Sequence, residues 1–152
     1  MTFFKRLYAS VVFTDRAMNW FSPLFLFGLR VYVANVFFKS GLTKVQDFSS
    51  TVALFENEYK VPLVSPTLAA FSGTAAELIL PALLVIGFAS RPTALALFVF
   101  NIVAVVAYPD ISESGVKDHI LWGTMILVIA FFGSGKLSVD QWIKARLGFL
   151  TA

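Results

Sequence analysis

The sequence predicts an all-α integral membrane protein, a four-helix bundle with an amphipathic interfacial helix at its N-terminal end. Of the 152 residues, 58% are hydrophobic and only 14% are charged, whereas soluble domains average about 45–50% apolar and about 25% charged residues. Four apolar segments also follow one another with too little polar chain between them to cover them. Membrane spans explain this pattern better than buried helices of a soluble protein.

The composition excludes several kinds of site. The chain has no cysteine and one histidine, so it cannot itself supply disulfides, thiolate metal ligands, a thiol relay or a multi-histidine metal site. The net charge of +3 is scattered beside apolar segments, which indicates membrane orientation rather than nucleic-acid binding. We expect no metal and no nucleic-acid partner, and the sequence indicates no catalytic residue.

Residues 1–20 are expected to form the interfacial helix. Apolar residues recur there at helical spacing and charges interrupt the run, a pattern typical of a helix lying in the membrane interface. The apolar positions are Phe4, Leu7, Tyr8, Val11 and Val12. A domain of four spans would occupy residues 21–141, and an amphipathic cytoplasmic tail residues 142–152.

The first span should run from about Pro23 to Leu42, because proline suits the first turn of a helix. Residues 43–65 form the longest connection, in which apolar residues at helical spacing predict a short surface helix. The second span is expected over 66–87, the third over 92–108 and the fourth over 118–133. The first two comfortably reach the roughly 20 residues that cross a hydrocarbon layer, whereas the third and fourth are short.

Lysine and arginine are distributed unequally between the two sides of the predicted bundle. The N-terminal segment, the turn between the second and third spans and the tail carry seven, against three or four on the other side. By the positive-inside rule both termini should be cytoplasmic, in a multi-pass protein of the bacterial inner membrane.

The first three predicted spans each contain a polar residue well inside the membrane. Counting the helical rise from the expected span edges places Arg30, Glu77 and Asn101 at nearly one depth. Charges in hydrocarbon normally face the bundle interior and a partner. We therefore expect an Arg30–Glu77 ion pair with Asn101 hydrogen-bonded to either member. Such a cluster could simply hold the helices together, or it could border a ligand cavity.

A second tier of polar residues lies near the predicted outer boundary. It consists of Lys39, Tyr108, Asp110, Asp118 and His119. A cation, a phenol, carboxylates and an imidazole could hold a quinone-like carbonyl ligand and exchange protons with water. The alternative is that a snorkelling lysine, an interfacial tyrosine and a helix-capping aspartate need no ligand. The candidate ligand-binding residues are therefore Arg30, Lys39, Glu77, Asn101, Tyr108 and His119.

Several short motifs occur in a characteristic order. Arg30 precedes the run Phe38-Lys39-Ser40-Gly41-Leu42-Thr43-Lys44, which contains a Ser-Gly-x-x-Lys pattern. Ala76-Glu77-Leu78 is followed by Gly87-Phe88-Ala89-Ser90-Arg91, and the last motif is Gly133-Ser134-Gly135-Lys136-Leu137-Ser138-Val139-Asp140. Over residues 24–141 the sequence resembles the DoxX family in these motifs, their order and their spacing.

The resemblance implies a small four-helix inner-membrane protein associated with redox systems. One branch of the family resembles a subunit of thiosulfate:quinone oxidoreductase, and other members accompany detoxification enzymes. The leading hypothesis is an integral membrane subunit of a quinone-linked complex, with quinone as ligand and with the bilayer and a further protein as partners. By itself the chain would be at most a subunit of an oxidoreductase. A non-catalytic anchor or assembly partner and a small-solute transporter are the alternatives, and a homo-oligomer stays open.

Overall fold

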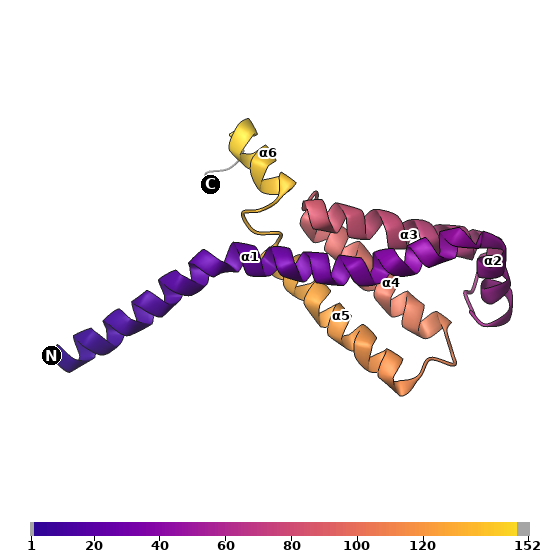
Figure 1. Cartoon of the computed structure of the whole chain (residues 1–152), viewed down its shortest axis with the longest axis horizontal. Coiled ribbons are helices and arrows are strands. Elements are labelled where there is room, and N and C mark those ends of the chain that lie inside the picture. Colours follow the sequence, from indigo (N-terminus) through magenta and orange to yellow (C-terminus); the bar gives the residue numbers. More distant parts are fainter. Residues whose placement is uncertain (1, 149–152) are drawn as a thin grey trace.

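The computed structural model describes residues 2–148, and all the regular secondary structure within them is helical (Figure 1). The first helix, α1, spans Thr2–Gln46. The others are α2 (Phe48–Asn57), α3 (Pro66–Ile86), α4 (Ser90–Ala107), α5 (Glu113–Phe132) and α6 (Val139–Leu147). Four of them, α1, α3, α4 and α5, are long and apolar enough to cross a membrane. The prediction of an all-α membrane protein with four spans is confirmed.

Helix α1 differs from the expected pair of separate segments. It is one continuous helix of 45 residues with Pro23 in its interior, so Pro23 does not begin a new span. By the helical rise its length is roughly 67 Å, about twice the hydrocarbon thickness. The helix changes direction near its middle, and its N-terminal half projects away from the bundle (Figure 1). Interior proline removes one backbone hydrogen bond and favours such a bend.

The other helix boundaries follow from their caps. The Ser65 side chain accepts a hydrogen bond from the Leu68 amide at the start of α3, and Ser112 accepts one from Gly115 at the start of α5. Because of this Ser112 cap, α5 begins five residues before the expected Asp118. The surface helix predicted in the 43–65 connection is α2. Residues 142–147 of the predicted tail belong to α6, whereas residues 149–152 of that tail lie outside the described residues.

The bundle is assembled from two closely packed helix pairs. Helix α1 packs chiefly on α3, and α4 packs on α5. Their shared core contains Val33, Phe37, Leu84, Leu97, Ile126 and Ile129. Gly41 sets the closest approach of the first pair, since a Cβ atom there would lie 2.9 Å from Leu78 Cδ2 and 3.0 Å from Glu77 Cβ.

The bundle has two different ends, visible in Figure 1. We call one the α2 end; it comprises α2 and the connections 58–65 and 108–112. The other is the α6 end, made of the 87–89 turn, the 133–138 connection and α6. Helices α1 and α4 run toward the α2 end, and α3 and α5 run away from it.

Candidate functional site

The predicted Arg30–Glu77 ion pair does not form. Arg30 is fully buried, and its Nη1 donates to the backbone carbonyls of Leu84 at 3.3 Å and Val85 at 2.9 Å. Its Nη2 donates to the carbonyl of Leu137. The last carbonyls of a helix have no partner within the helix, so Arg30 supplies donors to the C-terminal end of α3.

The helix register explains why Arg30 and Glu77 do not form the expected ion pair. Gly41 packs directly against Glu77, and Arg30 lies eleven residues earlier on α1. By the helical rise this separates Arg30 from Glu77 by roughly 16 Å along the helix axis. The depth estimate assumed a span beginning at Pro23, whereas the register of the continuous helix is set by the close contact at Gly41.

Arg30, Gly87 and Asp140 together form what we call the closing joint at the α6 end. Gly87 ends α3 in the left-handed conformation, at φ 70°. A Cβ atom there would collide with Arg30 Nη1 and with Ser138, so only glycine fits. The carbonyl of Gly87 in turn accepts a hydrogen bond from the Asp140 amide at 3.0 Å.

The Asp140 side chain caps α4. Its Oδ1 accepts from the Ala89 amide at 2.7 Å, and its Oδ2 accepts from the Ser90 amide at 2.8 Å and the Ser90 hydroxyl at 2.6 Å. Burial acts to raise the pKa of Asp140, but hydrogen bonds from Ser90 and Ala89 and the charge of Lys144 outweigh it and lower that pKa. The carboxylate is therefore held in its charged form.

Glu77 pairs with Lys44 instead of with Arg30. The Lys44 ammonium lies 2.9 Å from Glu77 Oε1 and 2.8 Å from Oε2. The Ser40 hydroxyl joins the pair, accepting from Lys44 at 2.8 Å and donating to Glu77 Oε1 at 3.1 Å. The Lys44 and Glu77 side chains are only 13% and 9% exposed, so this is a nearly buried ion pair.

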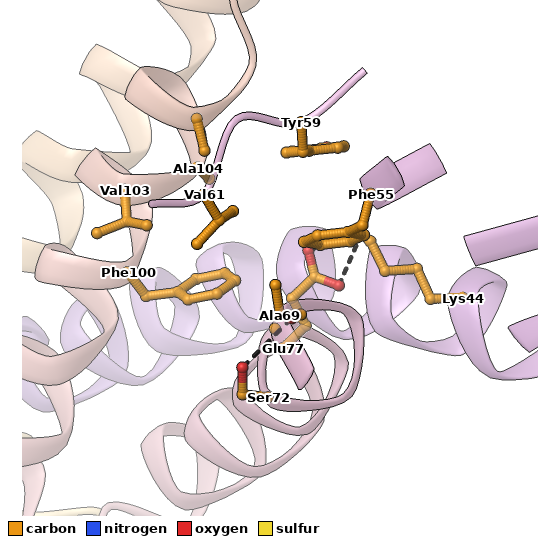
Figure 2. Close-up of a pocket in the computed structure, with 12 residues that line it drawn as sticks. Lys44, Phe55, Tyr59, Val61, Ala69, Ser72, Glu77, Phe100, Val103 and Ala104 are labelled. Atoms are coloured by element: carbon orange, nitrogen blue, oxygen red, sulfur yellow. Dashed lines mark hydrogen bonds and ion pairs between the residues drawn. The ribbon is translucent and has the colours of Figure 1, made fainter. Parts of the chain in front are cut away.

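The ion pair lines a pocket of about 240 Å³ between α1, α2, α3 and α4. Lys44 lies on one side of it and Phe100 on the other (Figure 2). The remaining walls are mainly apolar or small. They consist of Phe55, Tyr59, Val61, Ala69, Ser72, Gly73, Val103, Ala104 and Ala107. We call this cavity the Lys44–Glu77 pocket.

Aromatic rings at the α2 end cover the pocket. Phe55 and Tyr59 stack with centroids 4.5 Å apart, and Tyr59 lies 5.1 Å from the ring of Tyr108. Burial, followed by the charge of Glu77, raises the pKa of Tyr59. Its hydroxyl therefore remains protonated at neutral pH and can donate a hydrogen bond. The Tyr108 hydroxyl donates to Glu58 at 3.1 Å, which raises the pKa of Tyr108.

The hydrogen-bonding capacity of the ion pair is only partly used. All three ammonium protons of Lys44 have acceptors in Ser40 and Glu77. A carboxylate offers about four lone-pair sites, whereas Glu77 accepts three hydrogen bonds. Glu77 can thus accept one further hydrogen bond from a ligand, and Tyr59 can donate one.

Asn101 and His119 form a separate pair between α4 and α5. Asn101 Nδ2 donates to the His119 carbonyl at 3.0 Å, so Asn101 Oδ1 must be the acceptor for His119 Nδ1 at 2.8 Å. The imidazole also meets Trp122 edge-on, at 4.8 Å. This pair borders a groove of about 350 Å³ whose other walls are almost entirely apolar. Asn101 therefore contacts neither Arg30 nor Glu77.

The six predicted site residues are consequently spread over the molecule. Arg30 belongs to the closing joint, Glu77 to the pocket, and Asn101 with His119 to the α4–α5 pair. Tyr108 lies beside the aromatic cover, and Lys39 is exposed on α1. The candidate list lacked Ser40, Lys44 and Tyr59. The first two stand four residues apart in the Ser-Gly-x-x-Lys pattern, which places them on one helix face.

The chain was compared with known proteins. The sequence model of a family described as DoxX matches residues 25–109. This range includes the whole Lys44–Glu77 pocket and ends before the 133–140 motif. No curated protein and no solved structure matches the chain.

Proposed function

Since this chain belongs to the DoxX family, we propose that it is an integral membrane subunit that binds a quinone-like ligand in the Lys44–Glu77 pocket, within a redox-linked complex. One observation carries the proposal: a nearly buried ion pair forms part of the wall of an otherwise apolar cavity. Desolvation can cancel the attraction within a buried pair, which makes such a pair weak as a purely stabilising device. A few polar groups in an apolar pocket are the usual composition of a ligand site.

The residues of the pocket suit a ring with a carbonyl or hydroxyl group. Its volume of about 240 Å³ lies below the roughly 300–1,000 Å³ of sites for drug-sized ligands. A single-ring head group therefore fits, and a long apolar tail would lie outside, along the lipid. The Tyr59 hydroxyl would donate to a ligand carbonyl, and the unused acceptor site of Glu77 would bind a ligand hydroxyl.

A bound quinone would supply reversible uptake of electrons and protons. The protein's own residues would bind and orient the ring, with the Lys44–Glu77 ion pair holding a carboxylate oxygen in place to accept a hydrogen bond from a ligand hydroxyl. Phe55 and Tyr59 would exclude water from the pocket mouth. Because the chain has no cysteine and a single histidine, the electrons would come from a partner protein.

Trimethylhydroquinone, a soluble single-ring quinol that is kept reduced under nitrogen, tests the proposal directly. We expect the chain, purified in mild detergent, to bind trimethylhydroquinone, whose hydroxyl can donate to Glu77, and Glu77→Gln to raise the dissociation constant about tenfold, since a charge-assisted hydrogen bond contributes about 1.5–3 kcal/mol. The matched control is Glu113→Gln, which removes the carboxylate of the exposed Lys117–Glu113 pair. Equilibrium dialysis would measure both constants.

A second variant protects the test against misfolding. Ala104→Leu narrows the pocket while it leaves the ion pair intact, and Ala96→Leu makes the same change on an exposed position of the same helix. We expect Ala104→Leu to weaken trimethylhydroquinone binding and Ala96→Leu to leave it unchanged. Equal affinity in these two variants, or no binding by the unaltered chain, would contradict the proposal.

The projecting half of α1 favours a second candidate function, that of a non-catalytic assembly partner. Large apolar side chains are exposed along it, including Phe13 at 73% and Trp20 at 76%. Some of these would contact another protein rather than lipid. Loss of one defined co-purifying protein after deletion of residues 2–21, with trimethylhydroquinone binding absent throughout, would favour this function over the first.

We also propose that both termini are cytoplasmic, in a bacterial inner membrane. The described α6 end, residues 87–91 and 133–148, carries four cations and one carboxylate, whereas residues 47–65 and 108–118 at the α2 end carry six carboxylates and two lysines. This asymmetry fits the positive-inside rule. An impermeant maleimide added to intact spheroplasts should label Ser114→Cys but not Gln141→Cys, and the reverse pattern would invert the orientation.

A further inference from the structure

The α6 end contains a second cavity, of about 460 Å³, that the proposed quinone site does not use. It lies between the first turn of α4, the 133–138 connection and the first turns of α6. Three cations line it: Arg91, Lys136 and Lys144. Because it adjoins the ends of two membrane-spanning helices, α4 and α5, the cavity lies at the boundary between the hydrocarbon layer and water.

The three cations have no carboxylate partner at ion-pair distance among the described residues. The carboxylate that lines the cavity, Asp140, already accepts three hydrogen bonds from Ala89 and Ser90. Arg91 donates one hydrogen bond, to the Phe131 carbonyl at 3.3 Å. Three positive charges against one carboxylate leave an excess positive potential in the cavity.

Apolar side chains lie next to these charges. Phe131 and Phe132, at the end of α5, are 74% and 75% exposed, and Trp142 on α6 is 60% exposed. The guanidinium of Arg146 lies 5.6 Å from the centroid of the Trp142 ring. Aromatic residues combined with basic ones are typical of the membrane–water interface. A molecule seated in the cavity would thus meet cations at one end and lipid-facing rings at the other.

We propose that this cavity binds the anionic head group of a membrane phospholipid, with its acyl chains lying over the exposed end of α5. Phosphate oxygens accept hydrogen bonds from arginine and lysine, and basic pockets between membrane helices bind anionic head groups. The apolar flank distinguishes a lipid from a free phosphate ion, since only the lipid gains from contact with Phe131 and Phe132. The site is independent of the Lys44–Glu77 pocket.

Native mass spectrometry of the detergent-solubilised chain would test the site. We expect phosphatidylglycerol to bind more tightly than phosphatidylcholine. The triple variant Arg91→Gln/Lys136→Gln/Lys144→Gln should weaken phosphatidylglycerol binding at least about tenfold, since it removes all three cations that line the cavity. Inorganic phosphate should not compete at concentrations that match the lipid.

The control removes three cations elsewhere: Lys39→Gln/Lys60→Gln/Lys117→Gln changes the net charge equally but leaves the cavity intact. We expect this control to bind phosphatidylglycerol with an affinity within about twofold of that of the unaltered chain, because its three lysines do not line the cavity. Should the first triple variant fail to fold, the single substitution Lys136→Glu carries the test, because Lys136 is exposed and its charge reversal should still weaken binding.

Three results would overturn the proposal. Equal loss of binding in both triple variants would mean that net charge alone attracts the lipid. Equal affinity for phosphatidylcholine would remove the role of the anion. Full competition by inorganic phosphate would mean that the cavity binds a soluble anion and not a lipid.

Discussion

Arg30 and Glu77 satisfy their charges in the bundle interior in two different ways. Arg30 donates to carbonyls at the end of α3 and in the 133–138 connection, whereas Glu77 accepts from Lys44 and Ser40. The sequence identified both as interior residues, because ionisable groups within apolar segments are rare and face inward. Their partners could not be predicted, because backbone carbonyls are invisible in residue patterns and the Lys44 contact depends on helix register.

Asp47 illustrates a residue whose role depends on pH. It caps α2 by accepting from the Ser50 amide at 2.9 Å and hydroxyl at 2.6 Å, and from the Ser49 hydroxyl at 2.7 Å. These bonds, chiefly that from the Ser50 side chain, lower the pKa of Asp47 from 3.8 to about 2. Because the pKa is lowered, the carboxylate stabilises the folded α2 cap when the pH is above the ordinary pKa of 3.8. This contribution is lost as the pH falls to about 2.

We therefore expect the hydrogen-exchange protection of the Ser50 amide to decrease between about pH 4 and pH 2, the interval between the two pKa values. Asp47→Asn keeps an oxygen acceptor but does not titrate, so its protection factor at Ser50 should stay constant across the same interval. An equal decrease in the two proteins would show that another group causes the loss.

At the scale of elements, α1 is the least predictable part of the fold. Charged residues and Pro23 divide its sequence into an amphipathic part and an apolar part, which led to two predicted segments. Both parts favour helix, however, and an interior proline interrupts only one backbone hydrogen bond, so the helix continues from Thr2 to Gln46. Long apolar segments were sufficient to predict α3 and α4, and apolar residues at helical spacing predicted the surface helix α2.

Two glycines of α1 provide a matched test of how it packs on α3. Gly41→Ala should lower the free energy of unfolding by about 1–3 kcal/mol, the usual effect of overpacking, because its Cβ would press on Leu78 and Glu77. Gly28→Ala should be neutral or stabilising by up to about 1 kcal/mol, because alanine is the better helix former and no atom lies within 4 Å of its Cβ position. Thermal unfolding in detergent would measure both.

Comparable losses in the two alanine variants would mean that the effect comes from the helix itself. A neutral Gly41→Ala would mean that α1 and α3 are not in the close contact described.

At the scale of the whole molecule, the four spans could be predicted because their segments are long, apolar and closely spaced. The location of the candidate site could not. Counting depth from assumed span edges brought Arg30, Glu77 and Asn101 together, but the register of α1 against α3 separates Arg30 from Glu77, and Asn101 pairs with His119 across α4 and α5. The family pattern Ser-Gly-x-x-Lys contained Ser40 and Lys44, although spacing alone did not indicate that they meet Glu77.

The charge distribution gives the molecule two oppositely charged ends. The α2 end carries mostly carboxylates and adjoins the Lys44–Glu77 pocket. The α6 end carries mostly cations and contains the closing joint and the second cavity. In this arrangement a ligand would enter near the α2 end, while the α6 end would rest on anionic lipid. The two proposals therefore concern opposite sides of one membrane.

A double-mutant cycle is the most direct test of the central claim, which is that Glu77 forms an ion pair with Lys44 in the bundle interior. Thermal unfolding in detergent would be measured for Lys44→Met, Glu77→Gln, Arg30→Met and the double variants that combine Glu77→Gln with each of the others. We expect a coupling energy between Lys44 and Glu77 above about 1 kcal/mol, and one between Arg30 and Glu77 within about 0.5 kcal/mol of zero. A negligible Lys44–Glu77 coupling, or a larger one between Arg30 and Glu77, would contradict the account.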